Sequence, residues 1–238
     1  MIFQDDFPME MRAKVGLPGI APCRPDDWLR VDEAYAEQMA YRAELLTNKR
    51  AGVLWMDKAA RPVAEELLDE ALRVLGGLGF RLREGDVICP DGRRVVVDRS
   101  EPLLTLGHLV QEDLCILQKQ DHEHVLTGAV LCFPASWKLS DKIGKPLTSI
   151  HDPVPEYDAD LARRVQRMFD GVKAGHPLWR HNRLFYASSD LHQPWAKVEK
   201  PKMPFLRSER QVILRLPRTN AVIFSIHTWV LRDYPAEF

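Results

Sequence analysis

The sequence predicts a single α+β domain of 238 residues. Three observations lead to this fold class. Apolar residues recur with helical spacing within an N-terminal segment of about 26–75. Runs rich in β-branched residues, bounded by turn signals, begin near residue 85. One strongly amphipathic helix separates these runs from a last pair of strands, so we expect a sheet-and-helix core over about 85–232.

Two helices are predicted in the N-terminal segment. The first covers about 28–46, where apolar residues recur at spacings of four and seven, and Asp26 or Asp27 is expected to cap its start. The second covers about 61–75. Pro62 lies in its first turn, where a missing N–H costs nothing, and the Gly-Gly pair that follows ends it.

Strands are predicted next. "DVICPDGRRVVVD" is typical of two short strands around a Pro-Asp-Gly turn. "VQEDLCILQK" (110–119) and "VLTGAVLCF" (125–133) are expected to pair as a hairpin. We expect "QDHEH" between them to be a solvated hairpin tip, because it is highly polar. The alternative is that His122 and His124, on one side of a strand, begin a metal site.

Residues 134–158 lack periodicity, and loops of this length inside a domain are usually functional or disordered. Trp137 and other apolar residues favour an ordered loop. Pro153 and Pro155 forbid a helix, so His151 in "LTSIHDPVPEY" is expected on a stiff, extended piece of chain. A helix follows in "DADLARRVQRMFDGVKAG", with apolar residues at i, i+4, i+7, i+8 and i+11.

The chain ends in two predicted strands, 210–217 and 221–231, joined by a hairpin-length turn. Antiparallel strands interrupted by a helical segment, with one sheet face open to a ligand, are typical of a PAS-like fold. We therefore expect an antiparallel sheet with flanking helices that enclose a pocket.

Composition limits the function. The formal net charge is −1, and 28% of the residues are charged. This argues against nucleic acid or an anionic membrane as an obligatory partner, because phosphate binding usually leaves a basic footprint. No apolar run reaches the length of a membrane span, and the acidic start "MIFQDDFPMEMR" is unlike a signal peptide. We therefore expect a cytoplasmic protein.

The four cysteines include no CxxC pair, which excludes a zinc ribbon or a CxxC redox site. Cys115 and Cys132 lie in apolar runs and are expected to be buried thiols. No Gly-rich phosphate loop, GxSxG elbow, HExxH or Walker motif is present either. This weighs against nucleotide-dependent enzymes, typical hydrolases and zinc proteases.

Histidine and arginine supply the remaining candidates. A neutral imidazole such as His151 can bind iron through one nitrogen while the other donates to a carbonyl or carboxylate; a loop histidine bonded to backbone is the alternative. The arginines of "LRSERQVILRLPR" suit carboxylates, or lie on a solvated face. Trp179, Arg180 and Asn182 either line a pocket or lie on a solvated face. His227 either faces a pocket or is a satisfied sheet histidine.

Several motifs together resemble the haem-dependent oxidative N-demethylase family of the alpha-subunit type. They are "VQEDLC", "FPASWKLSDKIGKPLTSIHDPVP" and the "ERQVILRLPRT" segment, and the resemblance covers roughly residues 16–232. The resemblance implies a PAS-like fold around haem b and iron chemistry that uses oxygen. It also implies oxidative demethylation of a small secondary amine, with electrons from a separate reductase carrying flavin and an iron–sulfur cluster.

Site residues are carried over from matching motifs. The IHxPVP match makes His151 the expected axial iron ligand. The terminal segment makes Arg207, Arg210 and Arg215 expected contacts to haem propionates or the pocket. Candidate acids for the substrate are Glu112, Asp113 and Glu209.

Two other functions stay open. The same fold could serve as a non-catalytic sensor of haem or a small ligand, or as a binding subunit that has lost its cofactor. Because fold does not imply function, the resemblance supports haem more firmly than any particular substrate.

Overall fold

A single large antiparallel sheet organises the structure, a computed structural model that describes residues 1–12, 19–151, 159–195, 202–232 and 234. For residue 151 and residues 159–162 it describes the backbone alone. The eight-stranded sheet has the order β1-β8-β10-β11-β6-β7-β2, with β9 paired to β10, and every pairing in it is antiparallel. The strands are β1 (Ala21–Pro22), β2 (Leu54–Met56), β6 (Asp113–Gln120), β7 (Glu123–Val130), β8 (Leu178–His181), β9 (Leu184–Tyr186), β10 (Phe205–Arg215) and β11 (Val222–Arg232).

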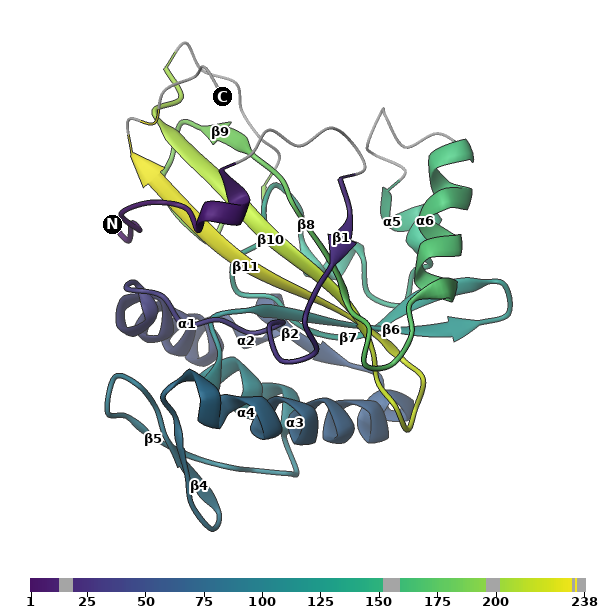
Figure 1. Ribbon diagram of the computed structural model, residues 1–238, viewed down its shortest axis with the longest axis horizontal. Helices are drawn as coiled ribbons and strands as arrows, with labels where there is room; N and C mark the ends of the chain where they lie inside the picture. Colours follow the sequence, from purple (N-terminus) through teal and green to yellow (C-terminus); the bar gives the residue numbers. More distant parts are fainter. Residues whose placement is uncertain (13–18, 152–158, 196–201, 233, 235–238) are drawn as a thin grey trace.

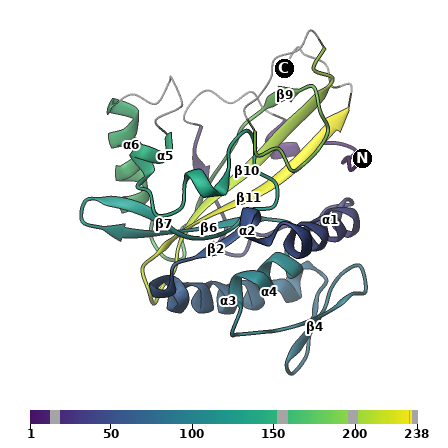
Figure 2. The ribbon, with the colours of Figure 1, turned by 180° about the vertical axis from the view of Figure 1, so that it is seen from behind.

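Helices lie on both sides of the large sheet (Figures 1 and 2). One side carries α1 (Tyr35–Asn48), α2 (Arg50–Val53), α3 (Arg61–Leu75) and α4 (Pro102–Leu109). The other carries α5 (Leu147–His151) and α6 (Ala159–Gly171). A small three-stranded sheet of β3 (Arg81–Leu82), β4 (Asp86–Ile88) and β5 (Arg94–Val96) projects beside α4. The predicted α+β class is therefore confirmed.

Each face of the sheet has its own apolar core. We call the face that packs on α1, α3 and α4 the α3 face; Leu114, Val212 and Ile223 lie on it with the buried side of α3. We call the opposite face the α6 face; Cys115, Ile213 and Ile226 lie on it with Leu147, Val165, Met168 and Phe169 of α5 and α6. This assignment follows from the alternation of side chains along a strand.

The second predicted helix and the β4–β5 hairpin are confirmed, but the first helix begins later than predicted. It starts at Tyr35, not near residue 28. The reason is that side chains just before β6 bind the preceding backbone: Arg30 N–H donates to Glu112 and Asp32 N–H donates to Gln111. Residues held in this way cannot close helical hydrogen bonds.

The hairpin expectation around "QDHEH" is wrong in part. Strands β6 and β7 pair through Gln120 and Glu123, so the turn is tighter than predicted. His122 is exposed in it, whereas His124 lies inside β7 and is 1% exposed. Its Nδ1 lies 2.8 Å from Gln166 Nε2 of α6, and burial lowers the pKa of its ring. His124 is thus part of the contact between α6 and the sheet.

The expected extended conformation at His151 is also wrong. Residues Leu147–His151 form the short helix α5, and His151 is its last residue. A proline restricts the residue immediately before it, which here is residue 152, and leaves His151 free to be helical. The prolines and the rest of that motif lie outside the described residues.

The burial predicted for two of the cysteines is confirmed. All four cysteines are free thiols, and Cys115 and Cys132 are buried. None of the helices that the structure describes is long and apolar enough to cross a bilayer.

Candidate functional site

Two buried polar groups lie on opposite faces of the β10–β11 pair. The first, which we call the Glu209 cluster, consists of Arg180, Asn182, Arg207, Glu209 and Gln211. The second, which we call the His227 network, consists of Gln4, Asp32, Gln111, Glu112 and His227. Strand alternation separates them, because odd positions of β10 such as Glu209 and Ile213 share the α6 face, whereas His227 points with Ile223 to the α3 face.

Glu209 is the centre of its cluster. Its Oε2 accepts hydrogen bonds from Asn182 Nδ2 and Gln211 Nε2, both at 3.1 Å. Its Oε1 has one cationic partner, Arg207, whose Nη2 lies 3.4 Å away. The carboxyl is 7% exposed, so this buried charge is held mainly by neutral amides and a long contact to one guanidinium. Such a carboxylate retains the capacity to accept from a cationic guest.

Arg207 is positioned by backbone carbonyls. Its Nη1 donates to Leu191 O at 2.9 Å and its Nη2 donates to Phe133 O. It therefore ties the loops that follow β7 and β9 to strand β10, while its Nε is buried without a hydrogen-bond partner in the described chain.

Arg180 differs from Arg207 in its contacts. It lies opposite Gln211 on strand β8, on the α6 face with Leu178. Its Nε is buried, and no described residue accepts a hydrogen bond from its guanidinium. Burial lowers the pKa of Arg180, and the charge of Glu209 offsets this in part. A half-buried guanidinium without an acceptor is a candidate anion site.

The α6 face next to this cluster is apolar and incompletely covered. Buried residues such as Ala129, Leu131 and Ile226 form its floor. Several large side chains around it are only partly buried: Trp55, Trp137, Ile143, Ile150, Leu178 and Phe224. Helix α5 borders this face through Leu147 and Ile150, so the backbone of His151 follows directly on residues that contact it. The side chain of His151 lies outside the described residues.

The structure does not bring Arg210 and Arg215 to Glu209. Arg210 points to the α3 face, where its Nη2 donates to Asp27 Oδ2 at 3.0 Å. Arg215 lies at the far end of β10 and donates to the carbonyls of Phe169 and Val172 at the end of α6. Both guanidiniums are thus used in contacts between segments.

Asp113 and Glu112 are adjacent in sequence but have different surroundings. Asp113 pairs with Arg42 at 2.6 Å and accepts the backbone N–H groups of Cys132 and Phe133, all buried. Glu112 Oε1 instead accepts from Arg30 N–H and from His227 Nδ1, and its buried Oε2 has no partner in the described chain. The local sequence contains no signal for these partners, because Arg42 lies 71 residues before Asp113.

The His227 network places an imidazole between two carboxylates. His227 Nδ1 lies 2.8 Å from Glu112 Oε1, and Nε2 lies 3.1 Å from Asp32 Oδ2. Burial alone would lower the pKa of His227, but these two carboxylates outweigh it and raise the pKa to about 9. Sequence reasoning missed Asp32, which lies within the residues assigned to the first helix.

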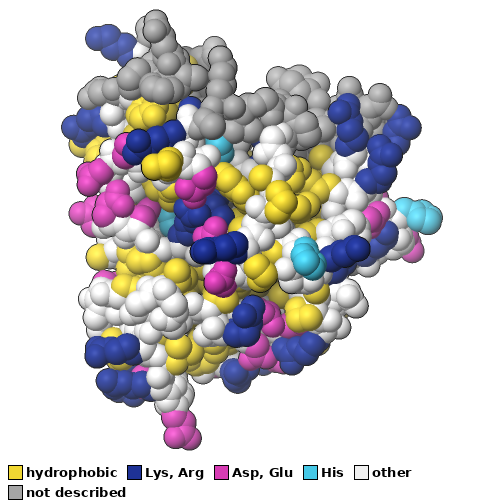
Figure 3. All heavy atoms as spheres, in the orientation of Figure 1, with side chains coloured by type: hydrophobic (Ala, Val, Ile, Leu, Met, Phe, Trp, Pro, Cys, Tyr) yellow, Lys and Arg dark blue, Asp and Glu magenta, His cyan; other side chains and the backbone are white. Residues whose placement is uncertain are grey.

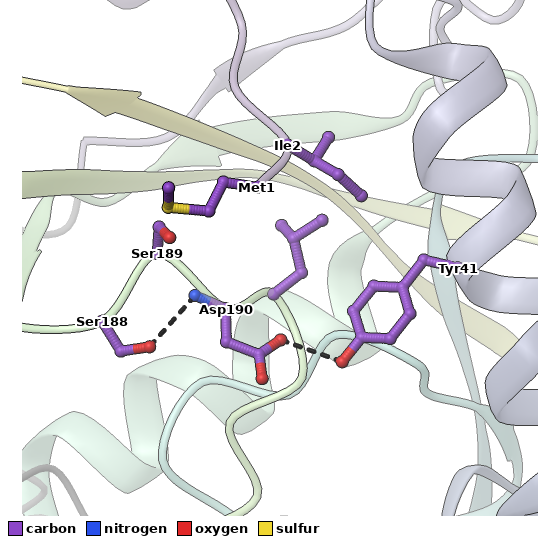
Figure 4. Close-up of a pocket in the computed structure, with 7 residues that line it drawn as sticks. Met1, Ile2, Tyr41, Ser188, Ser189 and Asp190 are labelled. Atoms are coloured by element: carbon purple, nitrogen blue, oxygen red, sulfur yellow. Dashed lines mark hydrogen bonds between the residues drawn. The ribbon is translucent and has the colours of Figure 1, made fainter.

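Two open pockets lie near the α3 face of the sheet. One, of about 300 Å³, is lined by Arg30, Asp32, Trp229 and the N-terminal residues Asp6 to Pro8, and so borders the His227 network. The other, of about 370 Å³, lies where Tyr41 Oη donates to Asp190 Oδ1 at 2.9 Å beneath the first two residues (Figure 4). Within the described residues no cluster of three His, Cys, Asp or Glu side chains could hold a metal ion.

A comparison with protein families identifies the chain. A family model described as haem-dependent oxidative N-demethylase, alpha subunit-like, matches residues 19–233, which is most of the chain. The match includes both strands of the Glu209 cluster, the helix that ends at His151, and every member of the His227 network except Gln4. The chain belongs to the haem-dependent oxidative N-demethylase, alpha subunit-like family.

Proposed function

We propose that this chain is a haem b-binding oxidoreductase that removes a methyl group from a small secondary amine, using oxygen and releasing formaldehyde. Membership of a family named for haem-dependent demethylation supports the general reaction. The designation as an alpha subunit supports the need for further components, which we propose to be a reductase with flavin and an iron–sulfur cluster. We also propose a PAS-like pocket and a cytoplasmic location.

The α6 face fits a haem. A haem is flat and largely apolar, with carboxylates on one edge, so it needs an apolar wall next to a cation. The partly covered aromatic and aliphatic side chains of this face supply the wall, and Arg180 supplies a guanidinium with no hydrogen-bond acceptor among the described residues. This guanidinium of Arg180 is the observation that carries the proposal, because a propionate would complete its hydrogen bonding. When bound, the haem would supply oxygen activation and redox capacity.

His151 is our proposed axial ligand. It ends α5, whose Leu147 and Ile150 pack on the α6 face. Because these two residues pack on the α6 face, the backbone of the last residue of α5 is held beside that apolar surface. Of the three arginines expected to contact propionates, Arg207 is the one beside Glu209, and its two amino groups hold loop carbonyls. We therefore assign Arg207 a positioning role and assign the propionate contact to Arg180.

Glu209 is our proposed substrate-binding acid. A secondary amine is protonated near neutral pH, and a buried carboxylate bonded mainly by amides attracts an ammonium ion. Asn182 and Gln211 orient the carboxylate, and Arg207 prevents it from rotating away. Glu112 and Asp113, the other two candidate acids, are engaged on other surfaces by His227 and Arg42.

Haem reconstitution of the purified chain tests the cofactor. We expect a Soret band, its strong reduction in His151→Ala, and partial recovery of that variant with added imidazole. The control His122→Ala, in an exposed turn, should keep the spectrum of the unmodified chain. Arg180→Ala should lose haem faster to apomyoglobin than Arg81→Ala does. Absence of a Soret band after reconstitution overturns the proposal.

Turnover separates the enzyme from a sensor. Reduced, haem-loaded protein with oxygen and a panel of secondary amines that includes dimethylamine should release formaldehyde. Glu209→Gln should lower this rate while the Soret band is unchanged, because it removes the charge and keeps the shape. Haem binding without formaldehyde across the panel, with a competent reductase present, would instead support a haem sensor.

A further inference from the structure

Two segments that pack on the α6 face are rich in basic residues, although the stretch between them contains Asp152, Glu156, Asp158 and Asp160. The whole chain has 33 Lys and Arg against 34 Asp and Glu. Residues 138–145 and 163–173 depart from this balance, because their acidic residues are only Asp141 and Asp170. Their basic residues are Lys138, Lys142, Lys145, Arg163, Arg164, Arg167 and Lys173. The rest of the chain is therefore acidic.

These two segments lie on one side of the molecule. Leu139 and Ile143 of the first, and Val165, Met168 and Phe169 of the second, pack into the same apolar cluster on the α6 face. The exposed charged side chains of both segments therefore lie on the outer side of this apolar cluster. Figure 3 shows dark blue side chains gathered over the α6 end of the molecule, at the right of the view.

Lys142 and Arg163 have partners, whereas the other basic residues of the two segments have no ion pair among the residues that the structure describes. Asp170 pairs at 2.5 Å with Lys119, which lies outside the two segments, so this acid does not neutralise one of their basic residues. Arg164 and Arg167 are exposed on α6, and neither has an ion pair within the described part of the chain. We call the exposed residues Lys138, Lys145, Arg164, Arg167 and Lys173 the basic patch.

We propose that the basic patch docks an acidic electron-transfer protein. This rests on the proposed function, in which electrons arrive from a separate protein. The patch adjoins α5, whose last residue is His151, so a protein bound there lies next to the proposed iron ligand. Electron-transfer proteins bind one another through small interfaces that form transiently, and opposite charges steer such partners together. Nucleic acid is less suited, because the remaining surface is acidic and would repel it.

A direct binding assay tests the patch without haem. The probe is an oxidised plant-type [2Fe–2S] ferredoxin, a small acidic protein, titrated into the full chain at low ionic strength. The double variant Arg164→Glu/Arg167→Glu should weaken binding by about tenfold or more, because two attractive charges become repulsive. The control Arg81→Glu/Arg83→Glu has the same charge change at exposed positions of the small sheet and should bind as the unmodified chain does. Raising the salt should remove the difference.

The outcomes separate this inference from the proposed function. Ferredoxin that does not bind, or that binds both double variants equally, overturns the inference whether or not the chain holds haem. Loss of binding to phosphatidylglycerol vesicles in Arg164→Glu/Arg167→Glu, with ferredoxin binding retained, would show a lipid-binding surface and also overturn it. If haem fails to bind while the ferredoxin result is as expected, the docking surface stands and the redox assignment falls.

Discussion

His227 of β11 donates to Glu112, the residue just before β6, with 2.8 Å between Nδ1 and Oε1, while its other ring nitrogen faces Asp32. Two facing carboxylates favour a proton on each ring nitrogen, in agreement with the raised pKa of His227, so the ring is favoured as a buried imidazolium. Asp32 belongs to the segment before α1 and accepts also from Gln4 of the N-terminal segment. One charged ring thus fastens two N-terminal segments to the sheet.

Stability should therefore depend on the charge of His227. Its folded pKa of about 9 exceeds the ordinary value of 6.5, so its contribution is complete below about pH 6.5 and is lost as the pH rises through 9. The difference corresponds to about 3 kcal/mol of unfolding free energy. Urea unfolding between pH 6 and 9.5 should show this decline.

The variant His227→Gln provides the control for that decline. It should be less stable than the unmodified chain at pH 6.5, because two buried carboxylates lose their cation. Its unfolding free energy should also vary much less between pH 6.5 and 9. An equal slope in both proteins would mean that another group titrates there.

The buried pair of Arg42 and Asp113 should matter for stability. Arg42 also donates to the backbone carbonyls of Gly107, Gln111 and Glu112, so it joins α1, α4 and β6. Arg42→Met should cost about 3–5 kcal/mol of unfolding free energy, because it leaves the Asp113 charge buried without its ion-pair partner. Arg61→Met, at a half-exposed pair with Glu65, should cost less than about 1 kcal/mol.

Two helical glycines should respond in opposite ways to alanine. A Cβ on Gly107 in α4 would lie 2.9 Å from side-chain carbons of Leu46 and of Val130, so Gly107→Ala should cost about 1–3 kcal/mol through overpacking. A Cβ on Gly52 in α2 would meet nothing within 4 Å, and Gly52→Ala should be neutral or stabilise by up to about 1 kcal/mol. Denaturant midpoints of the two variants decide this. A tolerated Gly107→Ala would mean that α4 can move away from the sheet.

Sequence periodicity predicted the helices and strands that have one buried and one exposed face. It failed for a helix that is apolar on all sides and for a strand whose charged residues are buried. Helix α3 is amphipathic and capped by glycine, and it lies where predicted. Helix α4 was missed because almost all of its eight residues are apolar, which leaves no helical period to detect. The start of β10 was missed because Arg207, Glu209 and Arg210 looked solvated, whereas all three are buried with partners.

The candidate site was predicted only as far as its residue types. Glu209, Arg207 and Arg180 were each singled out in the sequence, and strand pairing brings them together. The partner of His227 could not be predicted in the same way. Asp32 lies 195 residues earlier, and its approach depends on the whole sheet being formed.

The last prediction concerns Arg215, whose guanidinium caps the C-terminal end of α6. Its Nε donates to Val172 O at 2.7 Å and its Nη2 to Phe169 O at 2.6 Å, so it satisfies carbonyls that the helix end leaves open. Arg215→Met should weaken the hydrogen-exchange protection of the last turn of α6 by about 1–3 kcal/mol. Arg218→Met, on an exposed side chain paired with Asp69, should leave that protection unchanged. If Arg215→Met instead preserves α6 and reduces haem retention, the arginine contacts a propionate and the helix end does not need it.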